Sequence, residues 1–219
     1  MNKPITKEYI SSKGYVVEEL APRIFRIDDF MKKHEREQAI DIAENATDAQ
    51  WQEHYRKGLA GLAKLKYGRD DLDNMIEEGL VEVTQNWSDK TLPIHEYDFA
   101  RSLNQRMADL FSGFPELNAN GVGTLQRQPT GVPLKEHIDN HSDPSLAYAA
   151  VIYVNDEYTD GEIFFTKQDI QLKPVAGSLM LFPCGTDYPH GVRPPGEGPI
   201  RYVIPTFISK KNFYNRDGR

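Results

Sequence analysis

The spacing of hydrophobic residues changes near residue 115, where a helical period gives way to one closer to two. Upstream of this point, Phe99, Leu103, Met107 and Leu110 recur every three or four residues. This spacing places the four side chains on one face of a helix, which predicts an amphipathic helix over 95–112.

The rest of the upstream region also has a mainly helical pattern. The short apolar run Ile24–Ile27 suits a strand, and helical spacing follows it from about Asp28 to Glu44. Another helical stretch is expected from about Asp48 to Leu65. The pattern does not place residues 67–90. Because the segment 56–90 is long and irregular, it is a candidate for a lid or a substrate loop, although its mixed charges also suit an ordinary surface.

Downstream of residue 115, short apolar segments alternate with turns rich in Gly, Pro, Asp and Asn. About eight short strands are expected, a number that suits a two-sheet jelly roll. The expected strands are Val122–Gln128, Ala147–Val154, Glu162–Phe165, Ile170–Leu172, Ser178–Phe182, Ile200–Ile208 and two shorter ones that carry His137 and His190. The pattern therefore predicts an α+β protein with a mainly β core. We expect one domain over 1–219, with helical support in 1–115 and a double-stranded β-helix (jelly roll) in 116–212.

Composition narrows the classes of partner. The chain has 219 residues, of which 39% are hydrophobic and 27% are charged, as in a folded globular protein. A net charge of -7 argues against a nucleic-acid backbone as the main partner. No apolar run approaches the roughly 18 residues that a membrane span needs. The N-terminus lacks the apolar segment of a signal peptide, and the single cysteine, Cys184, fits a reducing cytoplasmic location. Nothing in the sequence indicates an oligomeric state.

Two histidines and one carboxylate are the candidate metal ligands. In an extended strand, residues i and i+2 point to the same side, so His137 and Asp139 are expected to face one point. His190 lies far downstream, and a jelly roll can bring such distant strand ends together. Two imidazoles and a carboxylate can occupy one face of an octahedral Fe(II) and leave positions open for substrate and dioxygen. The His137-x-Asp139 triplet alone occurs often by chance, and only the ordered series of residues makes it specific.

Arg201 is the candidate anion-binding residue. It begins the apolar segment Tyr202-Val203-Ile204, and an arginine on the inner side of such a strand is costly unless it is paired. A fixed guanidinium can hold a carboxylate through two parallel hydrogen bonds. The alternative is that Arg201 points outward into water. Tyr153 lies in another apolar strand and, taken alone, would be ordinary core.

From about Val122 to Ile208 the chain resembles the prolyl 4-hydroxylase branch of the Fe(II)/2-oxoglutarate-dependent dioxygenases. Intracellular prolyl hydroxylases that act in oxygen sensing look especially similar. The landmarks are, in order, His137-Ile138-Asp139-Asn140, Tyr153-Val154-Asn155, Asp160-Gly161-Glu162, Pro174 with Gly177, Leu181-Phe182, His190-Gly191-Val192 with Pro194, and Arg201-Tyr202. As an ordered set they are far more specific than any one motif.

The resemblance implies a role for each residue. His137, Asp139 and His190 would ligate Fe(II). Arg201 would pair with the distal carboxylate of 2-oxoglutarate, and Tyr153 would hydrogen-bond the same cosubstrate. Dioxygen would be the second cosubstrate, and the resemblance also allows ascorbate. The implied reaction is hydroxylation of a prolyl residue in a protein or peptide. A free amino acid or other small metabolite is the alternative substrate, and a non-catalytic jelly-roll binding protein is the alternative from another class.

The chain departs from this branch at several positions. Many relatives carry tyrosines nine and three residues before the first metal histidine, where this chain has Gln128 and Leu134. Gln128 could still donate a hydrogen bond to the cosubstrate, but Leu134 could not. Phe207 replaces a common tryptophan on the last strand. Pro205 removes a donor from the same strand, which predicts an edge or a distortion there. These changes leave the metal ligands intact and bear on substrate choice.

Overall fold

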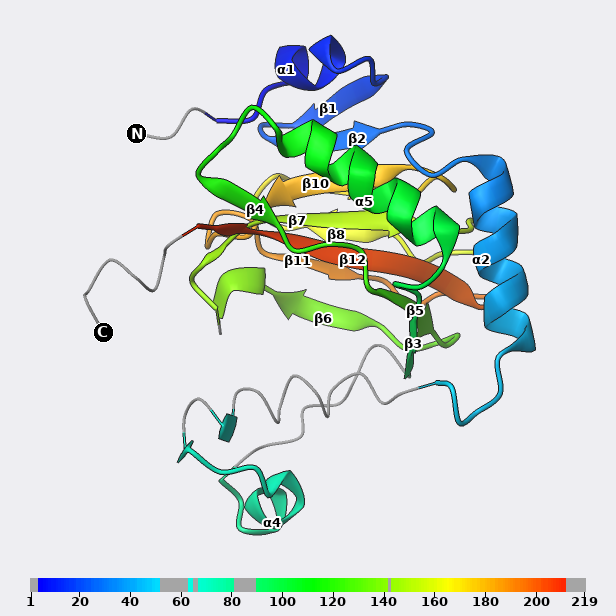
Figure 1. The fold of residues 1–219 in the computed structure, drawn as a ribbon, viewed down its shortest axis with the longest axis vertical. Coiled ribbons are helices and arrows are strands. Elements are labelled where there is room, and N and C mark those ends of the chain that lie inside the picture. Colours follow the sequence, from blue (N-terminus) through cyan, green and yellow to red (C-terminus); the bar gives the residue numbers. More distant parts are fainter. Residues whose placement is uncertain (1–3, 52–62, 65–66, 81–89, 142, 212–219) are drawn as a thin grey trace.

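Two antiparallel sheets form the body of the protein (Figure 1). The computed structural model describes residues 4–51, 63–64, 67–80, 90–141 and 143–211. The large sheet has the strand order β1-β2-β10-β7-β12-β5-β3, with β4 also paired to β12, and the small sheet has the order β6-β11-β8-β9. The strands are β1 (Val17–Ala21), β2 (Ile24–Ile27), β3 (Lys90–Pro93), β4 (Leu117–Ala119), β5 (Thr124–Gln128), β6 (Leu134–His137), β7 (Leu146–Tyr153), β8 (Ile163–Phe165), β9 (Ile170–Leu172), β10 (Leu179–Pro183), β11 (His190–Val192) and β12 (Arg201–Lys210). The helices are α1 (Lys7–Ser12), α2 (Lys33–Asn45), α4 (Leu72–Glu77), α5 (Asp98–Phe111) and the 3-10 helix η1 (Asp139–His141).

The jelly roll predicted from the sequence is confirmed. Every predicted strand is present within a few residues of its expected bounds, including the two short strands that carry His137 and His190. Three further strands, β1, β3 and β4, were not predicted. Two of these, with β2, come from the region before residue 115 and extend the large sheet at both edges.

The helical predictions are confirmed in part. Helix α5 lies within the predicted range, whereas α2 begins at Lys33, later than expected. The reason is a turn at Asp29, which has a φ of 50°, and this turn directs Phe30 and Met31 into the core. Most of the helix expected from Asp48 to Leu65 falls outside the described residues, as does much of the candidate lid over 56–90. No helix in the described part of the chain has both the length and the apolar character to cross a membrane.

Alternation along the central strands divides the core into two layers. Ile152 of β7 and Ile204 of β12 point toward the helices, where they join a cluster that contains the buried face of α5. Tyr153 and Val203 point the other way, into the space between the two sheets. Helix α5 covers the outer face of the large sheet (Figure 1). The inner face is therefore left free to line a site.

We expect Leu103→Ala to destabilise the protein without changing the site. Leu103 is fully buried in the outer core layer, so truncation removes apolar contacts and leaves a cavity worth about 2–5 kcal/mol. Denaturant unfolding would measure this loss. Metal affinity at 25 °C should stay unchanged, because Leu103 lies on the outer side of the large sheet and the site lies on the inner side. A loss below about 1 kcal/mol would contradict this description of the core.

Pro205 lies at a point where β12 is paired on one side only, so the expected edge is local, although the strand as a whole lies in the middle of the large sheet. Strand β12 is central and continuous from Arg201 to Lys210. On one side it pairs with β7 from Val203 to Ser209, with Pro205 opposite Val151. On the other side it pairs with β5 up to Val203 and with β4 from Ile208, so Pro205 lies between these two pairings. The backbone N–H that proline lacks therefore removes no hydrogen bond from the pairing of β12 with β5 or with β4.

Candidate active site

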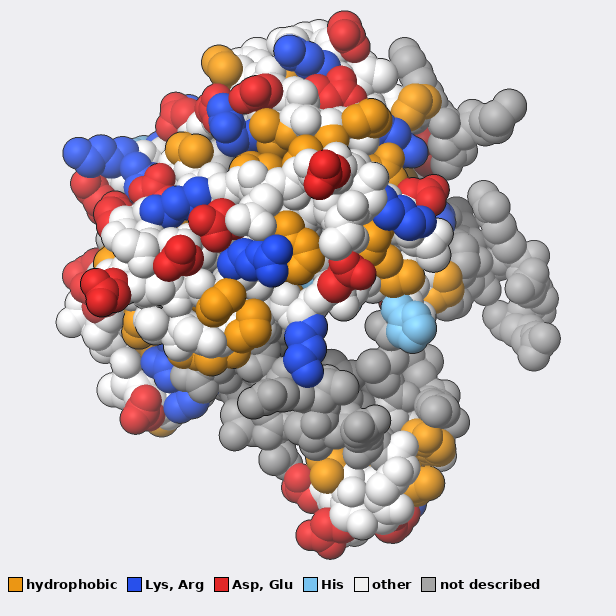
Figure 2. Space-filling view, turned by 180° about the vertical axis from the view of Figure 1, so that it is seen from behind, with side chains coloured by type: hydrophobic (Ala, Val, Ile, Leu, Met, Phe, Trp, Pro, Cys, Tyr) orange, Lys and Arg blue, Asp and Glu red, His pale blue; other side chains and the backbone are white. Residues whose placement is uncertain are grey.

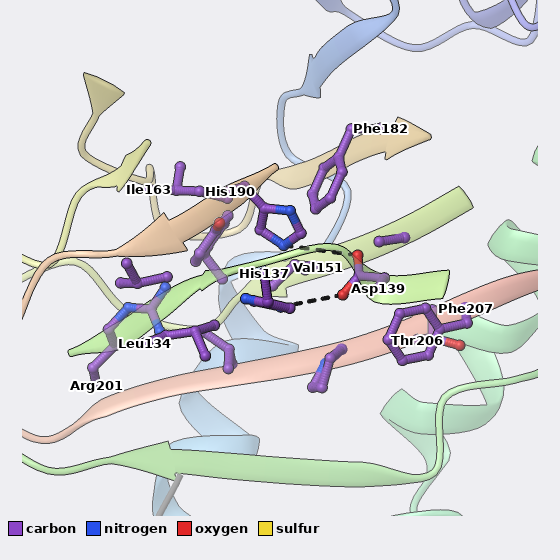
Figure 3. Close-up of a pocket in the computed structure, with 15 residues that line it drawn as sticks. Leu134, His137, Asp139, Val151, Ile163, Phe182, His190, Arg201, Thr206 and Phe207 are labelled. Carbon is purple, nitrogen blue, oxygen red and sulfur yellow. Dashed lines mark ion pairs between the residues drawn. The ribbon is translucent and has the colours of Figure 1, made fainter. Parts of the chain in front are cut away.

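His137, Asp139 and His190 converge between the two sheets (Figure 3). His137 ends β6 and His190 begins β11, and the two residues are direct partners in the antiparallel pairing. The Nε2 atom of His137 lies 3.3 Å from Asp139 Oδ1, and the Nε2 atom of His190 lies 3.7 Å from Asp139 Oδ2. The pairing of two strand ends thus joins residues that are far apart in the sequence.

The convergence of His137 and Asp139 arises differently from the prediction. The expected geometry placed both residues on one strand. In the structure β6 stops at His137, and Asp139 opens the 3-10 helix η1. The turn between them brings the carboxylate back to the imidazole. The structure brings the two side chains together, but not through the predicted local geometry.

Backbone carbonyls fix the orientation of both imidazole rings. The Nδ1 atom of His137 lies 2.9 Å from the carbonyl oxygen of Lys135, and the Nδ1 atom of His190 lies 3.1 Å from that of Tyr188. A carbonyl can only accept, so each Nδ1 carries the proton and each Nε2 presents a lone pair. This arrangement is the usual support for a metal-ligating histidine.

Packing holds His190 more tightly than His137. The His190 ring lies 4.6 Å from the Phe182 ring and 5.5 Å from the Phe165 ring, between centroids. Its neighbour Gly191 permits this position, because a Cβ there would lie 2.7 Å from the carbonyl oxygen of Leu134 on β6. A larger residue would push β11 away from β6.

The donor set fits a divalent transition metal. One ligand atom from each of His137, Asp139 and His190 lies within 4.8 Å of the others. Asp139 Oδ2 is buried and has no hydrogen-bond partner among the described residues, a costly state that a cation would relieve. Two imidazoles and one carboxylate that occupy one face and leave the other open are the donor set of non-heme Fe(II) oxygenases.

The two histidines have opposite pKa shifts. Burial lowers the pKa of His190, which favours the neutral form that a metal needs. Burial also lowers the pKa of His137, but hydrogen bonds to Asp139 and to the Lys135 carbonyl outweigh it, and the net pKa is raised. His137 is therefore the ligand at which a proton competes more strongly with the metal.

A pocket extends from these ligands between the sheets. The large sheet contributes Ala149, Val151 and Tyr153 from β7 and residues from Arg201 to Phe207 of β12, and the small sheet contributes apolar side chains such as Ile163 and Val192. The pocket contains about 530 Å³ of space, including its open mouth. Phe182 and Val192 form apolar walls of the pocket, whereas Leu181 packs in the core cluster that contains α5.

Arg201 lies inside this pocket, and the outward alternative is excluded. The residue is 2% exposed. One of its guanidinium nitrogens donates to Oε1 of Gln128, which lies directly opposite on β5. The guanidinium carbon is 5.4 Å from the centre of the Tyr153 ring. No acidic side chain of the described residues pairs with Arg201, so the pocket holds a buried, unneutralised positive charge.

Comparison with known proteins identifies the fold around this site. Residues 123–209 match the model of the 2OG-Fe(II) oxygenase superfamily. These residues form a 2OG-Fe(II) oxygenase domain. The matched segment contains both histidines, Asp139 and Arg201, and spans most of the predicted jelly roll. The resemblance inferred from the sequence is confirmed at this level.

Two solved structures share the fold of this chain over most of its length. One is a prolyl hydroxylase from Trichoplax adhaerens in complex with a hypoxia inducible factor oxygen degradation domain peptide fragment. It has a TM-score of 0.67 and 15% identity, covering 97% of this chain and 96% of that chain. The other is a viral collagen prolyl hydroxylase from Paramecium Bursaria Chlorella virus-1 in complex with 2OG. It has a TM-score of 0.59 and 14% identity, covering 88% of this chain and 99% of that chain.

A closer sequence match covers a short stretch. The chain is 37% identical over 51 residues to prolyl 3-hydroxylase 2 of Rattus norvegicus and, equally, of Homo sapiens. That stretch is 21% of this chain and 7% of the relative. The chain therefore spans a small part of the length of the curated relatives that it matches.

The structure places the predicted site residues in three groups. His137, Asp139 and His190 form the metal cluster, and Arg201 and Tyr153 line the pocket of the oxygenase domain. Gln128 lies behind Arg201, outside the residues that line the pocket. Tyr158 is a fully buried phenol in the loop after β7 that was not predicted, because its neighbours in the sequence are polar and show no hydrophobic periodicity.

Proposed function

We propose that this protein is an Fe(II)/2-oxoglutarate-dependent dioxygenase that hydroxylates a prolyl residue of a protein or peptide. The observation that carries the proposal is one pocket with two features. An open-faced cluster of two histidines and one carboxylate lies in it together with a buried guanidinium that lacks a counter-ion. The cluster suits Fe(II), and the guanidinium suits the far end of a dicarboxylic acid.

Each side chain has a part in this reaction. His137, Asp139 and His190 would hold Fe(II), and Arg201 would bind the distal carboxylate of 2-oxoglutarate with help from the Tyr153 hydroxyl. When bound, Fe(II) supplies the oxidation in which dioxygen and 2-oxoglutarate give succinate, carbon dioxide and one hydroxyl group on the substrate. The apolar walls exclude water from the reacting atoms. Ascorbate is an accessory reductant in this proposal.

The choice of a prolyl substrate is supported by the relatives. Prolyl 3-hydroxylase 2 is named for that residue, as are the two proteins of similar fold. The metal end of the pocket is also accessible, since the His137 side chain is 35% exposed, compared with 6% for His190. Such an opening suits a residue presented by a peptide. A free amino acid or small metabolite is the second candidate, and a cytoplasmic location is part of the same proposal.

The distribution of charged side chains on the surface favours a protein or peptide partner over a polyanion. On the face shown in Figure 2, Lys and Arg side chains are interspersed with Asp and Glu side chains. No extended basic patch is visible among the described residues of that face, in keeping with the net charge of -7.

A panel of substrates tests this proposal. Protein supplied with Fe(II), 2-oxoglutarate and dioxygen would be incubated with proline-containing peptides or with free amino acids, and products read by mass spectrometry. We expect one added oxygen on a peptidyl proline and faster succinate formation with that peptide. If oxygen is added only to a free amino acid, the substrate is a small metabolite and not a peptide. The absence of succinate with every substrate would favour the non-catalytic binding protein.

A further inference from the structure

Arg201 is held in place by neutral groups. It is 2% exposed, it donates to the side-chain oxygen of Gln128, and its guanidinium lies beside the Tyr153 ring. A buried charge without a counter-ion is destabilising, so proteins normally pair it with a carboxylate. Here no acidic side chain of the described residues fills that role. The charge is therefore kept available for an anionic ligand.

Gln128 is fixed by hydrogen bonds at both ends of its amide. It is fully buried and lies opposite Arg201 in the pairing of β5 with β12. Its Nε2 donates to the carbonyl oxygen of Val132 at 2.8 Å, and its Oε1 accepts from Arg201. Because a carbonyl can only accept, the amide nitrogen must face Val132 and the amide oxygen must face the guanidinium. Gln128 is fully buried and is not among the residues that line the pocket, so it is not placed to bind a cosubstrate directly.

Tyr158 supplies a second neutral group beside the same arginine. It is 1% exposed, and its hydroxyl is buried, as is Nε of Arg201. Burial raises the pKa of Tyr158, and Arg201 acts against that rise, first through its charge and then as a side-chain hydrogen-bonding group.

Close packing keeps the Tyr158 ring in position. A Cβ on Gly161 would lie 2.9 Å from the ring, and a Cβ on Gly198 would lie 2.7 Å from the Tyr158 Cα. The Lys173 ammonium, which follows β9, lies 5.4 Å from the ring centre. These contacts hold the Tyr158 ring in its buried place in the loop between β7 and β8.

We propose that Gln128 and Tyr158 are positioning residues that fix Arg201 and leave its positive charge for the distal carboxylate of a 2-oxo dicarboxylic acid. This inference rests on the proposed function, because it concerns the cosubstrate of the same site. The positioning role requires an uncharged side chain at position 128. A carboxylate there would pair with Arg201 internally and take the place of the ligand's own carboxylate.

The variant Gln128→Glu tests the requirement with the smallest change of shape. Calorimetric titration of the Mn(II)-loaded protein with 2-oxoglutarate, without oxygen, would measure binding apart from turnover. We expect the Kd for 2-oxoglutarate to rise about 100-fold or more, since a buried charge pair is lost. The Kd for Mn(II) should stay at the wild-type value, and circular dichroism would check that the variant folds, because the carboxylate loses the hydrogen bond to the Val132 carbonyl. Tyr158→Phe, which removes one hydroxyl and keeps the ring, should raise the Kd for 2-oxoglutarate about 10-fold.

Two controls separate positioning from general damage. The ligand control is 2-oxopentanoate, which has the same chain length and lacks the distal carboxylate, so both variants should bind it within about twofold of wild type. The protein control is Gln171→Glu. Gln171 is exposed on β9 and accepts from Nε of Arg193 at 3.2 Å, so this variant also places a carboxylate beside an arginine, outside the pocket. It should bind 2-oxoglutarate like wild type.

The possible outcomes separate a failure of the positioning role from a failure of the proposed function. Selective loss of 2-oxoglutarate affinity in Gln128→Glu and Tyr158→Phe, with unchanged 2-oxopentanoate binding, supports the positioning role. Wild-type affinity in both variants would overturn it and leave the proposed function standing. Equal loss for both ligands would also overturn it, since that pattern indicates a general disturbance. A wild-type protein that does not bind 2-oxoglutarate would overturn the proposed function itself, and this inference with it.

Discussion

Replacement of His190 by alanine is expected to abolish metal-dependent turnover. His190 is the most deeply buried of the two histidines, and its ring is held by Phe165 and Phe182. Alanine removes one of three ligand atoms and offers no substitute, because the neighbouring aromatic rings cannot bind a metal. Loss of a supporting contact already lowers metal affinity by about 10–100-fold, so loss of a ligand should exceed about 100-fold. Succinate formation should fall to background.

The matched control is His141→Ala. His141 lies two residues beyond Asp139, is exposed, and does not belong to the metal cluster of the described residues. The two variants remove the same side chain from neighbouring parts of the molecule. Metal titration and succinate formation would be measured on both, with circular dichroism as a check of folding. Turnover by a folded His190→Ala protein at the rate of His141→Ala would contradict the assignment of the ligands.

Replacement of Arg201 by alanine is expected to have the second largest effect. The guanidinium is the buried charge in the pocket, and truncation of one partner of a buried charge pair costs about 2–5 kcal/mol in binding. The KM for 2-oxoglutarate should therefore rise about 100-fold or more, while Fe(II) affinity stays the same. Steady-state assays over a range of 2-oxoglutarate concentrations would measure this.

Arg201→Ala is expected to weaken 2-oxoglutarate binding without lowering the stability of the ligand-free protein. Without ligand, the wild-type protein carries a buried guanidinium that no acidic side chain of the described residues neutralises. Removing it should leave the melting temperature of the ligand-free protein unchanged or raise it. Arg201→Lys keeps the charge but loses the planar geometry, so it should recover part of the affinity. A large fall in melting temperature with unchanged KM would show that Arg201 is structural.

The sequence predicted best where hydrophobic alternation is continuous. Strands β7 and β12 are long, central and apolar on both faces, and both were expected close to their observed bounds. Strands β3 and β4 were missed because each has three or four residues and owes its existence to pairing with β5 or β12. Such short segments acquire strand geometry from the sheet rather than from their own residues.

The site shows the same division between local and distant information. Types and order of residues sufficed to select His137, Asp139 and His190 as the metal cluster. The 3-10 turn at Asp139 was not predicted, because the sequence does not show where β6 stops pairing. The residues that surround Arg201 could not be predicted from the sequence either. Gln128 and Tyr158 approach it from separate parts of the chain, and the fold alone brings them together.

The most direct test is a simultaneous measurement of oxygen uptake and succinate formation by the purified protein with Fe(II) and 2-oxoglutarate. We expect both to occur, in equal amounts, and omission of the metal to stop both. Peptide substrates carrying proline should increase the two rates together. Binding of iron and 2-oxoglutarate without oxygen uptake or succinate formation would contradict the proposed function and favour a non-catalytic binding protein.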